Sequence, residues 1–411
     1  MLFRSRDPRA RERSQLAALA AQIAYAKAHA PAYARLLADI EPRDVTTRAA
    51  LSRLPVVRKS ELIELQRSER PFGGFATGAR GGAALVFASP GPIYEPEGAE
   101  ADYWRLARAL HAAGFVRGDL VHNCFSYHFT PGGAMLENGA RALGCTVFRG
   151  GTGQTEQQIE AMIHFRPNGY VGTPSFLKII LDKADELSLA VPSLKKALLS
   201  GEAVPQSFRE SLGKRGIRSS QVYATGDLGS IAYESEARDG LIVDEGVLVE
   251  IVRAGTGDAV SMGEVGEVVV TLLQNREYPL IRFGTGDLSA IEPSSLSTAS
   301  PCGRTNVRIK GWMGRADQTT KVKGMFVHPS QVAAIVARQP GAGRARLVVD
   351  NPDGTDVMTL HVEMAGGDAS VRDRMVMSVR EITKLRGEVV FRNPGELPND
   401  GKVIDDIRRY D

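Results

Sequence analysis

Short apolar runs alternate with amphipathic stretches of helical period along residues 83–223. The apolar runs predict β-strands, and the amphipathic stretches between them predict α-helices. The expected strands are residues 84–88, 120–124, 145–148, 169–171 and 196–200, and the expected helices lie near 99–114, 132–143, 155–165, 175–188 and 205–215. Strands that alternate with helices are typical of a parallel sheet covered by helices, so we expect an α/β fold.

The segments on either side of this region follow other patterns. Before it, leucine and isoleucine at helical spacing predict helices within residues 14–38, interrupted at Pro31 because proline lacks a backbone N–H. After Leu241 the apolar runs become shorter, are separated by glycine-rich turns and end at residues 280–283. This change of rhythm predicts a smaller β subdomain within the same large domain.

A domain boundary is expected within residues 311–317, which divides the chain into a large domain, 1–316, and a small one, 317–411. The small domain has strand-like runs at residues 346–349 and 359–362. It also has helix-like stretches near 330–338 and 369–384. This mixture predicts an α+β module.

Composition and charge exclude several classes of protein. The 411 residues are 43% hydrophobic and 24% charged, as in ordinary globular proteins that are soluble. The net charge of +3 is too small for this length to indicate nucleic acid or a membrane as partner, and no apolar run is long enough to span a bilayer. The N-terminus lacks the apolar stretch of a secretion signal. The odd, widely spaced cysteines, Cys124, Cys145 and Cys302, are typical of a reducing cytoplasm, where we expect the protein.

Two polar residues stand out in positions that suit phosphate and sugar chemistry. Asp287 follows an apolar strand, and a carboxylate there can accept both hydroxyls of a ribose, although a Gly-Asp turn alone is more often structural. Lys402 lies in a polar Gly-Lys turn near the C-terminus. A mobile cation suits chemistry that builds negative charge on phosphate and carboxylate oxygens, but most terminal lysines are simply solvated.

These residues belong to sequence blocks at 278–288, 314–324 and 398–405 that, in this order, resemble the phenylacetate–CoA ligase branch of the adenylate-forming ligases. The resemblance implies ATP-dependent activation of a small carboxylic acid, aromatic or arylacetic, through an acyl-adenylate, followed by thioester formation with CoA. It implies a mobile small domain that carries Lys402 as catalytic residue and turns about Asp317. It further implies that Asp287 and Arg315 hold the ribose and that Gly324 lines the CoA tunnel, where a side chain would block close approach.

The resemblance extends over nearly the whole chain and assigns further residues of the large domain. The nucleotide-binding residues it implies are Gly201, Glu202, Ala203, Tyr223, Ala224 and Thr225. Asp227 would face Mg²⁺, and the acyl pocket would include His128, Phe129, Thr130 and Gly132. The expected cofactors are therefore ATP, Mg²⁺ and CoA, and we allow for a homodimer.

Two positions depart from the family pattern. The phosphate loop keeps only Ser89 and Gly91, because Pro90 and Pro92 remove amide donors and the usual lysine is missing. Glu95, just beyond it, would repel polyphosphate if it pointed inward. In residues 223–227, the acidic block that supplies the acid expected to face Mg²⁺, Gly226 and Asp227 replace the usual hydroxyl residue and glutamate.

A structural zinc, which many relatives carry, is not expected. Its ligands would have to come from the neighbourhood of Ser235, Ile242, Ser300 and Cys302, where a single thiolate cannot hold a tetrahedral ion. Two other functions stay open: an adenylating enzyme that passes its acyl group to an amine or a carrier protein, and a non-catalytic nucleotide- or acyl-binding protein.

Overall fold

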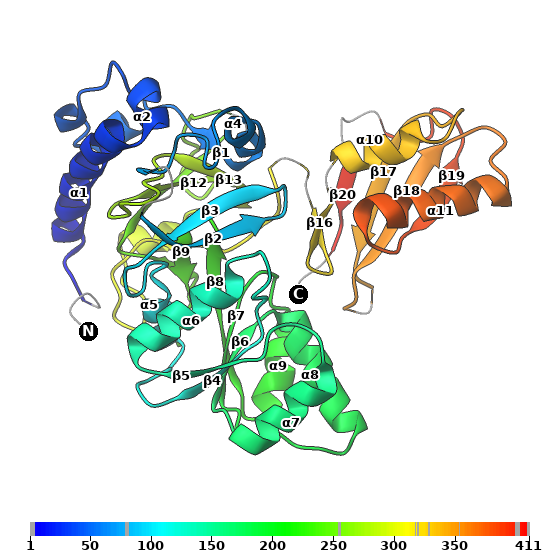
Figure 1. Ribbon diagram of the computed structural model, residues 1–411, viewed down its shortest axis with the longest axis horizontal. Helices are drawn as coiled ribbons and strands as arrows, with labels where there is room; N and C mark the ends of the chain where they lie inside the picture. Colours follow the sequence, from blue (N-terminus) through cyan, green and yellow to red (C-terminus); the bar gives the residue numbers. More distant parts are fainter. Residues whose placement is uncertain are drawn as a thin grey trace. The chain divides into compact units, whose positions relative to one another are not determined.

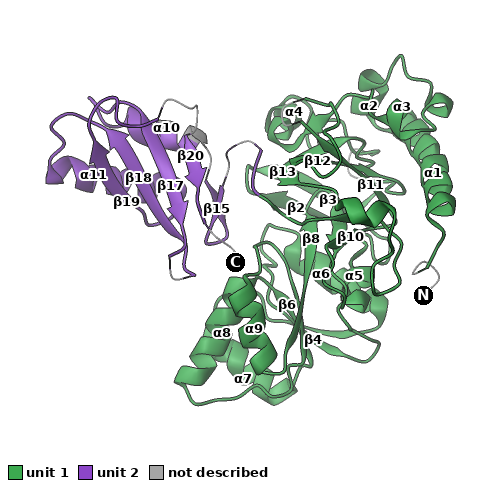
Figure 2. Cartoon of the chain, turned by 180° about the vertical axis from the view of Figure 1, so that it is seen from behind, with its two compact units in different colours: residues 1–313 green, residues 314–411 purple. Residues whose placement is uncertain are grey.

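The computed structural model describes residues 5–78, 82–253, 256–316, 318, 320–327, 329–352, 354–398 and 403–408, apart from the side chains of 329, 330 and 333. The chain forms two compact units, Met1–Met313 and Gly314–Asp411 (Figure 2). The sequence placed this boundary between residues 316 and 317. Asp317 and Lys402 lie outside the described residues.

The first unit contains an eight-stranded sheet with the order β14-β10-β9-β8-β7-β6-β4-β5. Its strands are β4 (Leu120–Asn123), β5 (Thr146–Arg149), β6 (Gly169–Gly172), β7 (Lys196–Leu199), β8 (Arg218–Thr225), β9 (Gly229–Tyr233), β10 (Leu241–Val243) and β14 (Arg308–Ile309). The run from β5 to β8 is parallel, and β9, β10 and β14 continue it in antiparallel pairs. The predicted parallel sheet is therefore confirmed.

Helices cover both faces of the parallel part (Figure 1). Helices α5 (Leu106–Ala112) and α6 (Gly132–Leu143) share a core with Val171, whereas α7 (Thr155–Phe165), α8 (Pro174–Glu186) and α9 (Gln206–Lys214) share another core with Tyr170. Successive side chains of a strand point to opposite faces, so both faces of β6 are buried. Because both faces are buried, such strands appear in the sequence as continuous runs of apolar residues.

The predicted β subdomain corresponds to a four-stranded sheet in the order β1-β13-β12-β11, but β10, which begins at Leu241, belongs to the eight-stranded sheet instead. Its strands are β1 (Val57–Arg58), β11 (Val247–Val252), β12 (Gly266–Leu272) and β13 (Phe283–Ser289). Helices α1 (Pro8–His29) and α2 (Pro31–Leu36) meet at the expected proline, and Leu19 and Ile23 of α1 share a core with Val268 of β12. Shorter helices, α3 (Arg48–Leu51) and α4 (Leu62–Ser68), complete this region.

One expected strand does not join the parallel sheet. β2 (Ala83–Ser89) instead pairs antiparallel with β3 (Ile93–Gly98) in a separate hairpin, so the placement of residues 84–88 was wrong. Leu85 and Val86 of this strand are 49% and 56% exposed. An apolar run by itself does not reveal which partner a strand will find.

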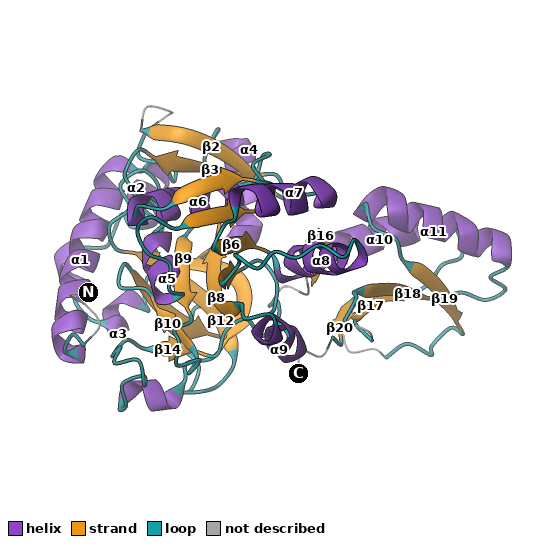
Figure 3. Cartoon of the chain, turned by 90° about the horizontal axis from the view of Figure 1, so that it is seen from below, coloured by secondary structure: helices purple, strands orange, loops and turns teal. Residues whose placement is uncertain are grey.

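The second unit is an α+β module, as predicted. Its main sheet has the order β19-β18-β17-β20, formed by β17 (Ala345–Asp350), β18 (Val357–Glu363), β19 (Glu388–Arg392) and β20 (Ile404–Asp406). Helices α10 (Pro329–Ala337) and α11 (Ala369–Thr383) cover one face (Figure 3), and Met375 and Val379 of α11 pack in the core with Leu360. A hairpin of β15 (Thr320–Val322) and β16 (Met325–Val327) precedes the sheet. In the described part of the chain, every helix is too short or too polar to cross a membrane.

Candidate active site

Asp287 lies within β13 and not, as the sequence had predicted, after a strand at residues 280–283, and it is held between two hydrogen-bond donors. The hydroxyl of Tyr223 donates to its Oδ2 at 2.8 Å, and the indole N–H of Trp312 donates to its Oδ1 at 3.1 Å. The backbone N–H of Asp287 donates to Thr285 Oγ1 at 3.0 Å within β13. The structure thus brings together two residues that the sequence assigned to the nucleotide, Tyr223 of β8 and Asp287 of β13, although their strands belong to different sheets.

The ends of the parallel strands carry the other residues assigned to the nucleotide. Gly201, Glu202 and Ala203 follow β7, and Ala224 and Thr225 end β8. The Ser200 hydroxyl donates to the carbonyl of Val222 at 2.8 Å, which ties the loop after β7 to β8. Glu202 accepts hydrogen bonds from the backbone N–H and the hydroxyl of Ser175 at the start of α8, at 3.1 and 2.9 Å. The carboxyl edge of a parallel sheet is where ligands bind in such folds.

A buried cluster of charged residues surrounds Asp227. The Lys59 ammonium donates to Oδ2 of Asp227 and lies 3.5 Å from Oε1 of Glu95. Glu95 is completely buried, and its Oε2 accepts a hydrogen bond from Ser89 at 2.9 Å. Burial and the neighbouring carboxylate of Asp227 raise the pKa of Glu95 to about 8, against the opposing effects of Lys59 and Ser89. Glu95 therefore points inward, toward the acidic block.

The surroundings of Asp227 fit a magnesium ligand at one oxygen. Oδ1 of Asp227 is buried and has no hydrogen-bond partner among the described residues. Mg²⁺ prefers oxygen ligands and is commonly held by one or two carboxylates together with phosphates and water. Oδ2 is already paired with Lys59, so this lysine supplies positive charge beside Asp227.

The degenerate phosphate loop is a tight hairpin turn between β2 and β3. Ser89 pairs with Ile93 across the turn, and a Cβ on Gly91 would lie 2.9 Å from the Ile93 side chain. The Ser89 hydroxyl is already engaged by Glu95. Because Pro90 and Pro92 have no N–H, this turn offers few donors to a phosphate.

The loop assigned to the acyl pocket connects β4 to α6. His128 is exposed and Phe129 is 82% exposed, with a φ of 59°. The N–H of Ala88 donates to the carbonyl of Phe129 at 2.8 Å, and the N–H of Thr130 to that of His128 at 2.6 Å, so β2 and the loop are joined. Gly132 opens α6, where a Cβ would have only an ordinary contact with Phe125.

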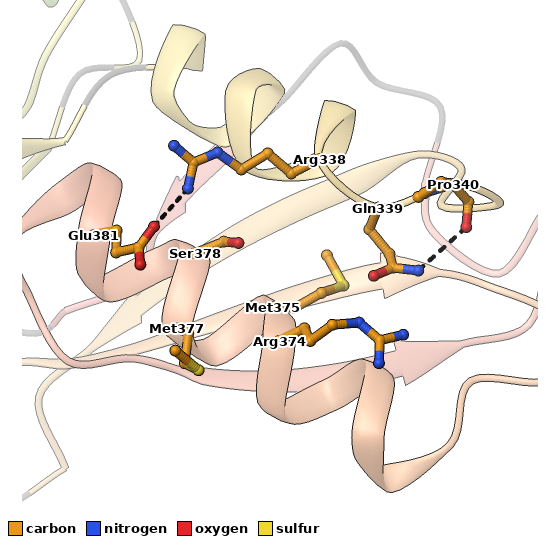
Figure 4. A pocket seen from close by; sticks show the side chains of 8 residues that line it. All are labelled: Arg338, Gln339, Pro340, Arg374, Met375, Met377, Ser378 and Glu381. Atoms are coloured by element: carbon orange, nitrogen blue, oxygen red, sulfur yellow. Dashed lines mark hydrogen bonds and ion pairs between the residues drawn. The ribbon is translucent and has the colours of Figure 1, made fainter.

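Of the assigned residues in the C-terminal unit, the structure describes two, Arg315 and Gly324. The Arg315 guanidinium lies 5.9 Å from the ring centroid of Phe326. Gly324 forms the turn between β15 and β16 with a φ of 83°, a conformation that glycine adopts readily, and a Cβ there would meet nothing within 4 Å. A shallow groove of about 470 Å³ between α10 and α11 (Figure 4) is lined by none of the assigned residues.

Comparison with known proteins decides the family. No family model matches the chain. The chain is 31% identical over 392 residues to the phenylacetate–coenzyme A ligase of Thermus thermophilus. This alignment covers 89% of this chain and 86% of that protein. The chain belongs to the phenylacetate–CoA ligase family. It is also 31% identical over 340 residues to the enzyme of that name from Aromatoleum evansii, with 79% of this chain and 74% of that protein covered.

The fold agrees with the family. A crystal structure of 2-hydroxyisobutyryl-CoA ligase, in complex with 2-HIB-AMP and CoA, superimposes with a TM-score of 0.84. It is 23% identical, and the match covers 99% of this chain and 91% of that one. The resemblance recognised in the sequence is therefore confirmed.

The positions at which we expected family members to carry zinc ligands are close together in this chain. Sγ of Cys302 lies 3.4 Å from Ser300 Oγ and accepts a hydrogen bond from Arg304 at 3.3 Å. Burial opposes ionisation, but hydrogen bonds from Ser235, Ser300 and Arg304 outweigh it and lower the pKa of Cys302 to about 7. Hydrogen bonds and a guanidinium thus surround the sulfur of Cys302.

Sequence reasoning gave no role to Lys59 or Trp312, and it gave Glu95 only a conditional one, that of repelling polyphosphate if it pointed inward. Lys59 and Glu95 contact Asp227, and Trp312 contacts Asp287. Trp312 carried a usable signal, because it is one of only two tryptophans and lies within the expected domain boundary. For Lys59, no local pattern in the sequence shows that it would meet Asp227.

Proposed function

We propose that this protein is an AMP-forming acid–thiol ligase that activates a small carboxylic acid through an acyl-adenylate and then forms its CoA thioester. The observation that carries the proposal is the match to the phenylacetate–coenzyme A ligase of Thermus thermophilus across 89% of the chain. The names of the relatives favour an arylacetic acid as substrate. The cysteines are buried and form no disulfide bonds, which is compatible with a location in the cytoplasm.

Asp287 would bind the ribose of the nucleotide. Each of its carboxylate oxygens accepts one hydrogen bond from a neutral donor, and a carboxylate oxygen can accept more than one hydrogen bond. The loop after β7, with residues 201–203, and the end of β8, with residues 223–225, would contact the adenine at the same edge of the sheet. Arg315 would add a second contact to the ribose.

In the first half-reaction, a carboxylate oxygen of the acid attacks the α-phosphorus of ATP, and pyrophosphate leaves. Lys402 would stabilise the negative charge that develops between the carboxylate and the α-phosphate, an effect worth on the order of 3 kcal/mol for a well-placed donor. Asp227 would hold Mg²⁺, which balances the charge of the phosphates. The Lys59 ammonium beside Asp227 adds fixed positive charge there.

In the second half-reaction, the thiol of CoA attacks the acyl carbonyl, AMP leaves, and the thiol proton is released. The C-terminal unit would turn about Asp317 between the two steps, so that Lys402 withdraws and the turn at Gly324 serves the thiol. Domain motions of this kind commonly limit turnover.

A panel of carboxylic acids tests the proposal. Purified protein is incubated with ATP, Mg²⁺, CoA and one acid at a time, and AMP and the acyl-CoA are measured by mass spectrometry. We expect equal amounts of both with an arylacetic acid and none without an acid. Acid-dependent AMP without thioester, restored by an amine or a carrier protein, would favour the alternative acceptor. Absence of AMP with every acid, in protein that is folded, would contradict the proposal.

A further inference from the structure

The contact between Trp312 and Asp287 has no role in the chemistry described so far. Trp312 is partly buried, and its indole N–H donates to Oδ1 of Asp287 at 3.1 Å. The Tyr223 hydroxyl donates to the other oxygen at 2.8 Å. With one donor on each oxygen, the carboxyl group cannot rotate about its Cβ–Cγ bond without breaking both hydrogen bonds.

The position of Trp312 is itself set by the backbone. Lys310 N–H donates to the carbonyl of Ala290 at 3.0 Å, and Met313 N–H to that of Leu288 at 2.9 Å, so hydrogen bonds on both sides of Trp312 hold the segment against the end of β13. Gly311 has a φ of 98°, which a residue with a side chain rarely adopts. The segment is therefore shaped to bring the indole to Asp287.

The choice of donor has a chemical consequence. Arginine or lysine in place of Trp312 would add a positive charge beside Asp287, whereas indole and phenol donate hydrogen bonds without adding charge. Hydrogen bonds to a charged acceptor are about twice as strong as those between neutral groups. A carboxylate that is oriented in advance also loses less freedom when a ligand binds.

We propose that Trp312 is a positioning residue for nucleotide binding: it orients Asp287 toward the ribose hydroxyls and carries the effect of ribose binding into segment 310–313. This inference rests on the proposed function, because it takes the ribose to bind at Asp287. The chain passes from this segment into the C-terminal unit at Gly314. The indole of Trp312 thus contacts the ribose site, and its backbone belongs to the segment that leads along the sequence into the C-terminal unit.

The test compares two nucleotides on two variants. Trp312→Phe keeps an aromatic ring but removes the N–H, and Trp104→Phe is the matched control, because Trp104 is the other tryptophan and packs on Tyr103 in a different core. AMP and 2′,3′-dideoxy-AMP are titrated by calorimetry. We expect Trp312→Phe to weaken AMP by about tenfold and dideoxy-AMP by less than about twofold, and Trp104→Phe to leave both within about twofold.

Fluorescence gives a second readout that does not depend on the folding of Trp312→Phe. In Trp104→Phe, Trp312 is the only tryptophan, so its emission should change with AMP and stay unchanged with saturating dideoxy-AMP. Equal weakening of both nucleotides by Trp312→Phe, or an emission that responds to both alike, would overturn the inference and leave the proposed function intact. If the unaltered protein binds neither nucleotide, the proposed function fails as well.

Discussion

The carboxyl group of Glu95 fills the space that a side chain on residue 226 would need. A Cβ on Gly226 would lie 2.5 Å from Oε2 of Glu95 and 2.9 Å from Cγ of Pro131, both closer than carbon atoms in proteins approach such neighbours. The side chain of Glu95 and any side chain at residue 226 would therefore compete for the same space. Glu95 enters the site from β3, and Gly226 makes room for it.

We expect Gly226→Ala to destabilise the protein by about 1–3 kcal/mol, because overpacking a filled interior costs that much. The destabilisation should be smaller when Glu95→Ala is present as well, since one of the two close neighbours is then gone. Urea unfolding of both single variants and the double variant measures this coupling. Gly213→Ala is the control, because a Cβ there meets nothing within 4 Å. Additive effects of the two substitutions would mean that the residues do not compete for space.

The raised pKa of Glu95 also predicts how the free energy of unfolding depends on pH. Its pKa rises from an ordinary 4.5 to about 8 in the folded protein, so the folded state binds a proton that the unfolded state has lost. This contribution is fully present below pH 4.5 and is lost as the pH rises through 8. We expect the unfolding free energy to fall between these values by at most roughly 1.4 kcal/mol per pH unit on account of Glu95.

Glu95→Gln, which cannot ionise, should flatten this part of the stability profile. Guanidinium unfolding at a series of pH values, with a chelator present, checks it. Glu100→Gln removes the same charge from an exposed position and should keep the slope of the unaltered protein. A slope that Glu95→Gln leaves unchanged would show that other groups titrate in this window.

The hairpin at Ser89–Ile93 predicts poor binding of the departing phosphates. The Ser89 hydroxyl already donates to Glu95, and Pro90 and Pro92 have no N–H. The β- and γ-phosphates of ATP should therefore add little binding free energy at this turn. We expect AMP to bind at least about tenfold more tightly than ATP in calorimetric titrations. Replacing the turn by a longer loop of serine, threonine and glycine with a lysine should tighten ATP alone. Equal affinities for ATP and AMP, unchanged by the graft, would mean that this turn is not a phosphate site.

Lys402→Ala should separate the two half-reactions. Adenylate formation should fall by about 10²–10³, because the charge developing on the carboxylate and α-phosphate loses its donor. Thioester formation from a supplied acyl-adenylate should continue. Lys384→Ala, which removes an exposed lysine from the same unit, is the matched control for both assays. Equal losses in both half-reactions would contradict the assignment of Lys402 to the first.

The amino-acid sequence by itself predicted the family, the helices that cover the parallel sheet and most of its strands, although it placed β2 wrongly. The expected helices near 132–143 and 155–165 coincide with α6 and α7, because burial of one helix face leaves a periodic pattern that short segments display. The order of the sequence blocks was likewise readable, and the match to the relatives confirms it.

Only the tertiary structure decided which side chains meet. Glu95 lies 36 residues from Lys59 in the sequence, Asp227 lies 168 from it, and Trp312 lies 25 from Asp287. No local period encodes such contacts, and an apolar run such as β2 does not show whether it will enter the sheet or form a hairpin. Contacts of this kind follow from the packing of whole elements, because each depends on the positions of strands and turns that are distant along the chain.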